Sequence, residues 1–189
     1  MLVSRNGERL DIVLNRPERH NAYSMEMRDA LTEALELAAA DDSLHEIVLA
    51  GRGASFSAGG DLAEFGSRPD PATAHAVRSA RNAARLLSHC AERVRAEVHG
   101  ACIGAGAELA AFAAFVVAQP DTYFELPEVS MGLIPGAGGT ASIARRIGRQ
   151  RTAFIALTGA RMDANTALEW GLVDSIRADE EHAPGLATP

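Results

Sequence analysis

The sequence predicts an α/β fold in which short strands and helices alternate around a layered sheet core. Three observations support this class. Short apolar runs recur along the chain, and stretches with helical spacing follow them. Glycine-rich segments separate the two kinds of stretch. No low-complexity tract or long linker interrupts the alternation. Such an order is typical of layered domains that place helices against sheets.

A hairpin and a long helix are predicted first. Asn6 and Gly7 lie between two short β-type runs, which is the strongest local signal for a hairpin turn. The second run ends before Pro17, which cannot continue a strand ladder. Ser24 can cap a helix that continues to about Ala40, because its apolar residues fall on one stripe.

The rest of the chain continues the alternation. Prolines within 67–73 predict a loop, and a helix is expected from there to about Ser88. Glu108 lies early in an alanine-rich helix. The remaining expected elements are strands over 46–50, 94–98 and 115–118, and helices around 139–147, 150–157 and 163–170.

Composition excludes several classes of function. The 189 residues predict one core domain over 1–175 and a short, flexible polar tail over 176–189. A formal net charge of −7 argues against nucleic-acid binding, since no basic surplus exists to neutralise phosphates. No apolar run approaches the roughly 20 residues that span a bilayer, and the N-terminus lacks a signal-peptide layout. Two cysteines give no disulfide framework, so we expect a cytoplasmic protein without a membrane partner.

The residues that point to chemistry are two glutamates beside glycine-rich segments. Glu108 follows Gly104-Ala-Gly106, and Glu128 precedes another glycine-rich stretch, 132–139. A third segment of small residues covers 57–60. Glycine allows the backbone to approach a ligand closely, and paired carboxyl groups can divide acid and base roles. These features favour an enzyme that acts on a carbonyl compound through an enolate.

Two nucleotide-binding interpretations fail. The dinucleotide fingerprint would need a third glycine where Leu109 stands. The segment 136–140 lacks the lysine of a phosphate-binding loop. The histidines show no spacing for metal ligands, and no metal site is expected.

Five segments in this order resemble the crotonase superfamily, which contains enoyl-CoA hydratases and isomerases. They cover residues 14–22, 56–62, 99–109, 124–140 and 157–174. The resemblance implies a crotonase-like fold of repeated ββα units. It also implies a short form, because the family normally continues with a helical C-terminal region after the position of Asp174.

The resemblance assigns roles to residues of the site. A thioester carbonyl would be held by the backbone N–H groups of Ala58 and Ala105, which form an oxyanion hole. Glu108 would activate the water that attacks C3 of an enoyl thioester, and Glu128 would deliver a proton to C2. The implied enzyme is an enoyl-CoA hydratase, a lyase of fatty acid metabolism. Isomerisation by Glu128 alone remains an alternative, as does a non-catalytic protein that binds CoA or a partner.

The resemblance also places the ligand and the assembly. Coenzyme A is part of the substrate, so no separate cofactor is implied. The family commonly has a leucine where Tyr23 stands. A homo-oligomer is expected, either a trimer or a dimer of trimers. The residues expected near CoA are Arg19, Ala22, Ala58, Gly60, Asp61 and Leu62.

Overall fold

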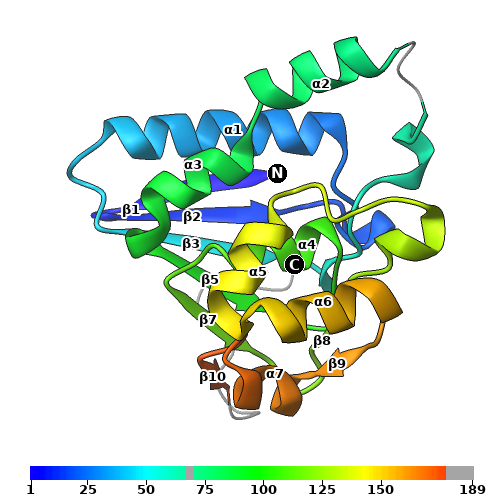
Figure 1. The fold of residues 1–189 in the computed structure, drawn as a ribbon. Helices are drawn as coiled ribbons and strands as arrows, with labels where there is room; N and C mark the ends of the chain where they lie inside the picture. The colour runs from blue at the N-terminus through cyan, green and yellow to red at the C-terminus, as the bar shows by residue number, and fades with distance from the viewer. Residues whose placement is uncertain (67–69, 178–189) are drawn as a thin grey trace.

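Two β-sheets organise the computed structural model, which describes residues 1–66 and 70–177 (Figure 1). The larger sheet has six strands in the order β1-β2-β3-β5-β7-β10. All neighbours in it are parallel except β1 and β2, which form the predicted hairpin. Its strands are β1 (Leu2–Asn6), β2 (Arg9–Leu14), β3 (Glu46–Gly51), β5 (Val94–Val98), β7 (Phe115–Ala118) and β10 (Ser175–Ile176).

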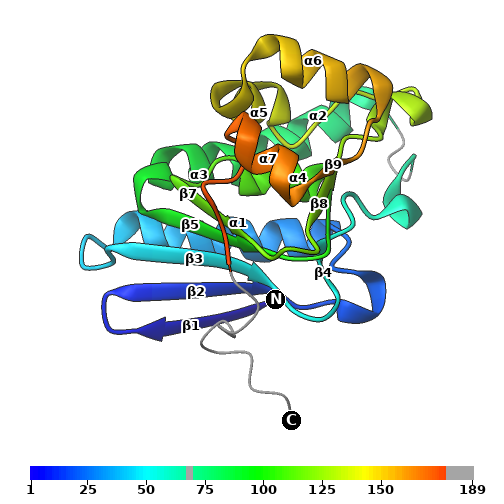
Figure 2. The same ribbon diagram turned by 90° about the horizontal axis from the view of Figure 1, so that it is seen from below.

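A smaller sheet stands at the end of the larger one (Figure 2). Its strands are β4 (Ser55–Ser57), β6 (Ala101–Ile103), β8 (Tyr123–Glu125) and β9 (Met162–Asp163), in that order. The chain passes from β3 into β4, from β5 into β6 and from β7 into β8. At Gly100, between β5 and β6, φ is +54° and a Cβ would lie 2.2 Å from the carbonyl oxygen of Ala54. Only glycine fits this turn.

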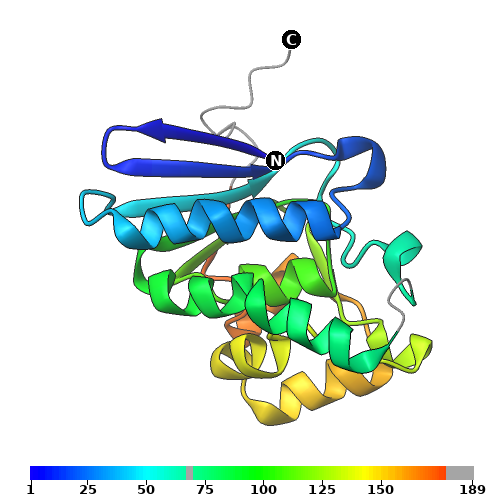
Figure 3. The same cartoon turned by 90° about the horizontal axis from the view of Figure 1, so that it is seen from above.

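Two helices, α1 (Met25–Ala40) and α3 (Ala83–Cys90), cover one face of the six-stranded sheet (Figure 3). Leu31 and Leu35 of α1 are fully buried with Ile12 and Leu14 in the same core cluster. The hydroxyl of Ser24 accepts the N–H of Met27 at 3.2 Å and caps α1 as predicted.

Among the other helices, one follows each of the strand pairs β3–β4, β5–β6 and β7–β8, so the expected ββα repetition is present. Single 3-10 turns occur as η1 (Pro17–Arg19), η2 (Leu62–Glu64), η3 (Ala91–Arg93) and η4 (Glu128–Met131). The helices are α2 (Pro71–Ala80), α4 (Ala105–Ala110), α5 (Gly139–Ile147), α6 (Arg149–Thr158) and α7 (Ala164–Trp170).

The structure confirms the expected hairpin and the strands near 46–50, 94–98 and 115–118. The single helix expected to end at about Ser88 is wrong, because two helices occupy this stretch. The side chain of Asn82 accepts the N–H of Arg85 at 2.9 Å and starts α3 as a new helix. Part of the expected loop, 67–69, and most of the expected tail, 178–189, lie outside the described residues.

Among the described residues, no helix combines the length and the apolar character needed to cross a membrane.

Candidate active site

The candidate site lies where the parallel strands β4, β6 and β8 end. Their register aligns Ser57 with Cys102, and Cys102 with Phe124. The segments that follow these strands therefore meet at one edge of the smaller sheet. Ligands of parallel α/β folds bind at such carboxyl edges. The loop 57–61, which we call the amide loop, meets the start of α4 and the start of η4 here.

The amide loop packs directly against the end of β6. A Cβ on Gly59, whose φ is +88°, would lie 2.9 Å from the carbonyl oxygen of Ile103 and 3.7 Å from the Cα of Gly104. Glycine at this position lets the two backbones approach. The approach brings the amide loop close to the Gly104 turn that begins α4.

Hydrogen bonding corrects one of the two expected amide donors. The N–H of Ala58 donates to the carbonyl of His20 at 2.8 Å, so it is not free to bind a ligand. The N–H of Gly60 has no acceptor among the described residues. The N–H of Ala105, at the first position of α4, has none there either. The unpaired donors at this edge are therefore Gly60 and Ala105.

A buried asparagine holds the amide loop in place. Asn21 is fully buried, and its side-chain amide donates to the carbonyls of Arg52 and Ser55 at 2.9 and 2.8 Å. Its own carbonyl accepts the hydroxyl of Ser57 at 2.8 Å. Both His20 and Asn21 have positive φ, at 49° and 54°. This left-handed backbone conformation costs about 1–2 kcal/mol per residue. The hydrogen bonds of Asn21 stabilise the chain in this conformation.

Glu108 is almost fully buried, with 1% of its surface exposed. Its Oε2 accepts the N–H groups of Ala137 and Gly139 at 2.7 and 2.6 Å. Burial raises the pKa of Glu108 to about 7, the N–H of Gly139 opposes this rise, and the charge of Glu128 adds to it. A Cβ on Gly139 would lie 2.5 Å from the Cγ of Glu108, so glycine is required beside this carboxyl group.

Glu128 begins η4 and points at the start of α4. A Cβ on Gly104, where φ is +48°, would lie 2.6 Å from Glu128 Oε1. The Oε2 atom of Glu128 is buried and has no hydrogen-bond partner among the described residues. Burial is the main cause that raises the pKa of this carboxyl group. The structure thus brings the two predicted glutamates close enough for their charges to interact.

The residues expected near CoA lie in or beside the same edge, with different roles in the fold. The carboxylate of Asp61 pairs with Arg16 at 2.9 Å and caps η2, and the Arg16 hydrogen bond lowers its pKa. That side chain is therefore engaged within the protein. Arg19 and Leu62 are exposed, and Ala22 is half-buried. A contact between any of these residues and CoA stays a prediction.

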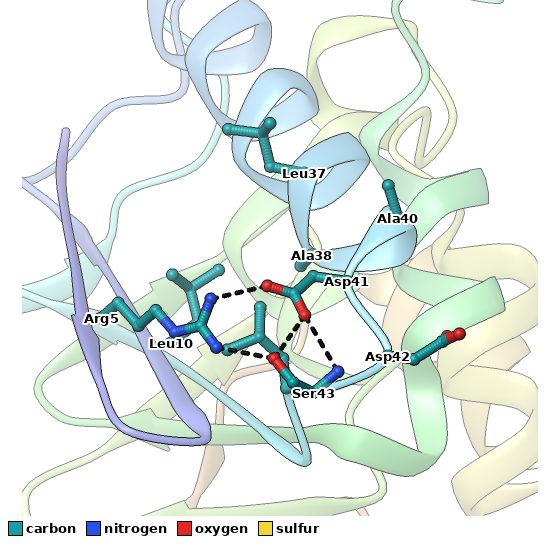
Figure 4. A pocket seen from close by; sticks show the side chains of 9 residues that line it. Arg5, Leu10, Leu37, Ala38, Ala40, Asp41, Asp42 and Ser43 are labelled. Carbon is teal, nitrogen blue, oxygen red and sulfur yellow. Dashed lines mark hydrogen bonds and ion pairs between the residues drawn. The ribbon is translucent and has the colours of Figure 1, made fainter.

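A hollow at the opposite end of the six-stranded sheet contains no comparable groups. It is lined by Arg5, Asp41 and Ser43 together with apolar residues of α1 (Figure 4). Arg5 donates to Asp41 and Ser43 at 2.6 and 2.7 Å, so its polar groups satisfy one another. No group of three potential metal ligands occurs within residues 1–66 and 70–177.

Comparisons with known proteins agree with this geometry. The family model described as enoyl-CoA hydratase/isomerase matches residues 6–183. A 2,3-dehydroadipyl-CoA hydratase from Escherichia coli is 36% identical, with 93% of this chain and 68% of that protein aligned. A 1,2-epoxyphenylacetyl-CoA isomerase from the same organism is 35% identical, with 90% of this chain and 67% of that protein aligned.

Solved structures give the same result. Pseudomonas aeruginosa AtuE superimposes with a TM-score of 0.88 at 32% identity, over 95% of this chain and 70% of that one. An enoyl-CoA hydratase from Thermoplasma volcanium gives 0.85 at 36% identity, over 95% and 72% of the two chains. The chain therefore spans about two thirds of the length of these relatives. It belongs to the crotonase family, the family of enoyl-CoA hydratases and isomerases.

Proposed function

We propose that this protein is an enoyl-CoA hydratase that adds water across the C2–C3 double bond of a trans-2-enoyl-CoA. One observation carries the proposal. Two carboxyl groups with raised pKa values, Glu128 against the Gly104 turn and Glu108 in the helix that follows this turn, accompany two backbone N–H groups that lack acceptors among the described residues. Free donors at this point suit an oxygen atom that gains negative charge.

The N–H groups of Gly60 and Ala105 would bind the thioester oxygen. As water attacks C3, electrons move through C2 to this oxygen and form an enolate, which the two donors stabilise. Removing one such donor typically costs about 3–4 kcal/mol of transition-state stabilisation. Gly60 replaces Ala58 in this role, since the Ala58 N–H is already bonded to His20.

The division of labour proposed for the two carboxyl groups follows the family resemblance, since burial raises the pKa of both, that of Glu108 to about 7. Glu108 accepts two backbone N–H groups, which favour its ionised form and suit a base that takes a proton from water. Glu128 has a buried oxygen without a donor, which favours the neutral acid. Glu128 would then give its proton to C2, and the product would be a 3-hydroxyacyl-CoA. Proton loss at Glu108 and uptake at Glu128 restore the enzyme.

The test is a panel of CoA thioesters followed by mass spectrometry. A hydratase converts a trans-2-enoyl-CoA into a product heavier by one water. An isomerase that uses mainly Glu128 shifts the double bond and leaves the mass unchanged. A protein that binds CoA thioesters without converting any of them would contradict the proposal and favour a non-catalytic role.

The proposal extends to assembly. Large apolar side chains are exposed along η4 and the turn after it, including Val129, Met131 and Ile134, the last with 76% of its surface accessible. Phe154 and Leu157 of α6, which packs beside η4, are exposed too. Such a concentration favours an interface, and we expect a trimer or a dimer of trimers. Light scattering that shows a stable monomer at micromolar concentration would contradict this expectation.

A further inference from the structure

A chain of hydrogen bonds leads from the guanidinium of Arg16 to the free N–H of Gly60. The Nη1 atom of Arg16 donates to the carbonyl of Ala22 at 2.8 Å. The N–H of Tyr23, which belongs to the same peptide unit as that carbonyl, donates to the carbonyl of Gly59 at 2.7 Å. The N–H of Gly60 belongs in turn to the peptide unit of the Gly59 carbonyl. Because the carbonyl and the N–H of a trans peptide unit point in opposite directions, the chain continues through both units and ends at Gly60.

Both peptide dipoles in this chain have the same sense. Each unit turns its carbonyl oxygen toward Arg16 and its N–H toward the carboxyl edge of the smaller sheet. The positive charge of Arg16 therefore lies at the carbonyl end of the chain and makes the final N–H more positive. Hydrogen bonds in such a chain polarise one another, which strengthens each by about 10–30%. The Gly60 N–H should consequently be a better donor than an isolated amide.

Asp61 closes the chain into a ring and partly offsets its charge. Its N–H donates to the carbonyl of Tyr23 at 3.2 Å, which completes a β-bridge between Tyr23 and Gly60. Its carboxylate accepts from the same Nη1 atom of Arg16 at 2.9 Å. The negative charge of Asp61 opposes the effect of Arg16 on the peptide units. Removal of either charge alone should therefore change the Gly60 donor in opposite directions.

The backbone around Arg16 is held by bonds that do not involve its side chain. The N–H of Arg16 donates to Oδ1 of the buried Asn21 at 2.8 Å. Its carbonyl accepts the N–H groups of Arg19 and Asn21, both at 2.9 Å. A substitution of the Arg16 side chain leaves these three bonds in place. The effect of the guanidinium on Gly60 can therefore be separated from the fold of the loop.

We propose that Arg16 is a positioning residue, which directs and polarises the Gly60 N–H toward the thioester oxygen. The inference rests on the proposed hydration and adds the side chain that supports one of its two amide donors. An enolate oxygen carries more negative charge than the oxygen of the bound thioester. A stronger donor therefore stabilises the transition state more than the ground state, and its loss should lower kcat rather than raise KM.

The first test compares substitutions that keep or remove each charge. Arg16→Gln should lower kcat by about tenfold, which is part of the loss that follows removal of a whole oxyanion donor. The KM for the enoyl thioester should change by less than about twofold. Arg16→Lys keeps the charge and should remain within about threefold of the wild-type kcat. Asp61→Asn keeps the shape of the side chain and removes the opposing charge, so its kcat should equal or exceed that of the wild type.

Arg9→Gln provides a matched control. Arg9 pairs with Asp11 at 2.6 Å, and the two side chains are 29% and 18% exposed, close to the 27% and 16% of Arg16 and Asp61. Arg9 is the first residue of β2, whereas Arg16 follows the last residue of this strand. Loss of an equivalent ion pair at the far end should leave kcat unchanged.

Infrared spectroscopy of a bound saturated acyl-CoA tests the donor without turnover. A stronger hydrogen bond lowers the stretching frequency of the thioester carbonyl, so Arg16→Gln should raise this frequency and Arg9→Gln should not.

The full kcat and an unshifted carbonyl in folded Arg16→Gln would overturn the inference about Arg16 and leave the hydratase intact. Equal losses of kcat in Arg16→Gln and Arg16→Lys, or a comparable loss in Asp61→Asn, would show that charge is not the cause and would overturn it too. A wild-type protein that binds thioesters without converting them would overturn the hydratase, while the carbonyl frequency would still test Arg16.

Discussion

The two ends of the six-stranded sheet differ in how completely their polar groups are hydrogen-bonded within the protein. At the amino end of β2, the guanidinium of Arg5 donates to Gly7, Asp41 and Ser43 at 2.6–2.9 Å, and Asp41 also accepts from Ser43 (Figure 4). At the carboxyl end, where the smaller sheet stands, several donors and acceptors have no partner within residues 1–66 and 70–177. They include the N–H groups of Gly60 and Ala105 and Oε2 of Glu128.

This difference separates structural polar groups from functional ones. Buried polar groups without partners cost folding free energy, so they persist where a ligand completes them. The Arg5 cluster is partly exposed and self-satisfied, which indicates that it joins the hairpin to the turn after α1. The hollow beside it is therefore a poor candidate for catalysis. The following predictions test this contrast.

Glu128→Gln should have the largest effect. The substitution keeps the size of the side chain but removes the proton needed at C2, so kcat should fall by about 10²–10⁴-fold. Glu125→Gln, three residues earlier and paired with Arg161 at 3.6 Å, provides the matched control. Steady-state kinetics on folded variants would measure the effect. Turnover of the Glu128 variant at the wild-type rate would defeat its assignment.

Ala105→Pro should lower turnover by about 10²-fold, because it removes the N–H proposed to bind the thioester oxygen. Proline is accepted at the first position of a helix, so α4 should still form, as circular dichroism can check. Ala105→Gly keeps the N–H and should retain most of the activity. Equal kinetics for the two variants would show that Ala105 is not a donor.

Gly139→Ala should lower kcat by tenfold to about 10²-fold, because the new Cβ displaces the side chain of Glu108. A double-mutant cycle gives the decisive measurement. If the effect acts through Glu108, adding Gly139→Ala to Glu108→Gln should cause little additional loss. Additive losses would instead indicate a general disturbance of α5.

The pH dependence should report Glu108. As the base, it must be ionised, so kcat should fall by about tenfold per pH unit below about pH 7. The free energy of unfolding should change with pH in the opposite direction. The folded-state pKa of Glu108 is raised from 4.5, so its favourable contribution is complete below pH 4.5 and is lost as pH rises through 7. At pH 8, Glu108→Gln should increase the free energy of unfolding by up to about 3 kcal/mol. A decrease in denaturation experiments would contradict this sign.

Arg5→Ala should have the smallest effect. Because the Arg5 side chain is 48% exposed, loss of its ion pair with Asp41 should cost at most about 1 kcal/mol of unfolding free energy. Turnover should be unchanged, since the cluster lies at the other end of the sheet. A substantial loss of kcat in a folded Arg5→Ala protein would break the distinction between the two ends.

Predictions from the sequence were right for features that depend on neighbouring residues. They were wrong where residues distant in the sequence determine the structure. The Asn6-Gly7 hairpin and the Ser24 cap follow from adjacent residues, and both are confirmed. The choice between Ala58 and Gly60 as a donor depends on the carbonyl of His20, which is remote in sequence. No pattern around Ala58 could show that its N–H is already occupied.

The roles of Glu108 and Glu128 followed from resemblance, whereas their environments required the structure. The amides of Ala137 and Gly139 reach Glu108 only because α5 packs on α4. The break at Asn82 was missed because the helical spacing continues across it, whereas the Asn82 side chain accepts the N–H of Arg85 and begins a new helix.

The order of strands in the larger sheet has a consequence for synthesis on the ribosome. From β1 to β10, each strand joins the sheet beside the one that preceded it in that sheet, so the sheet can grow in one direction as the chain emerges. The amide of Gly139 emerges 31 residues after Glu108, the carboxyl group that it binds. At about 5–20 residues per second, this delay lasts a few seconds. For almost all of that interval Glu108 lacks both of its amide donors, because the N–H of Ala137 emerges only 29 residues after it.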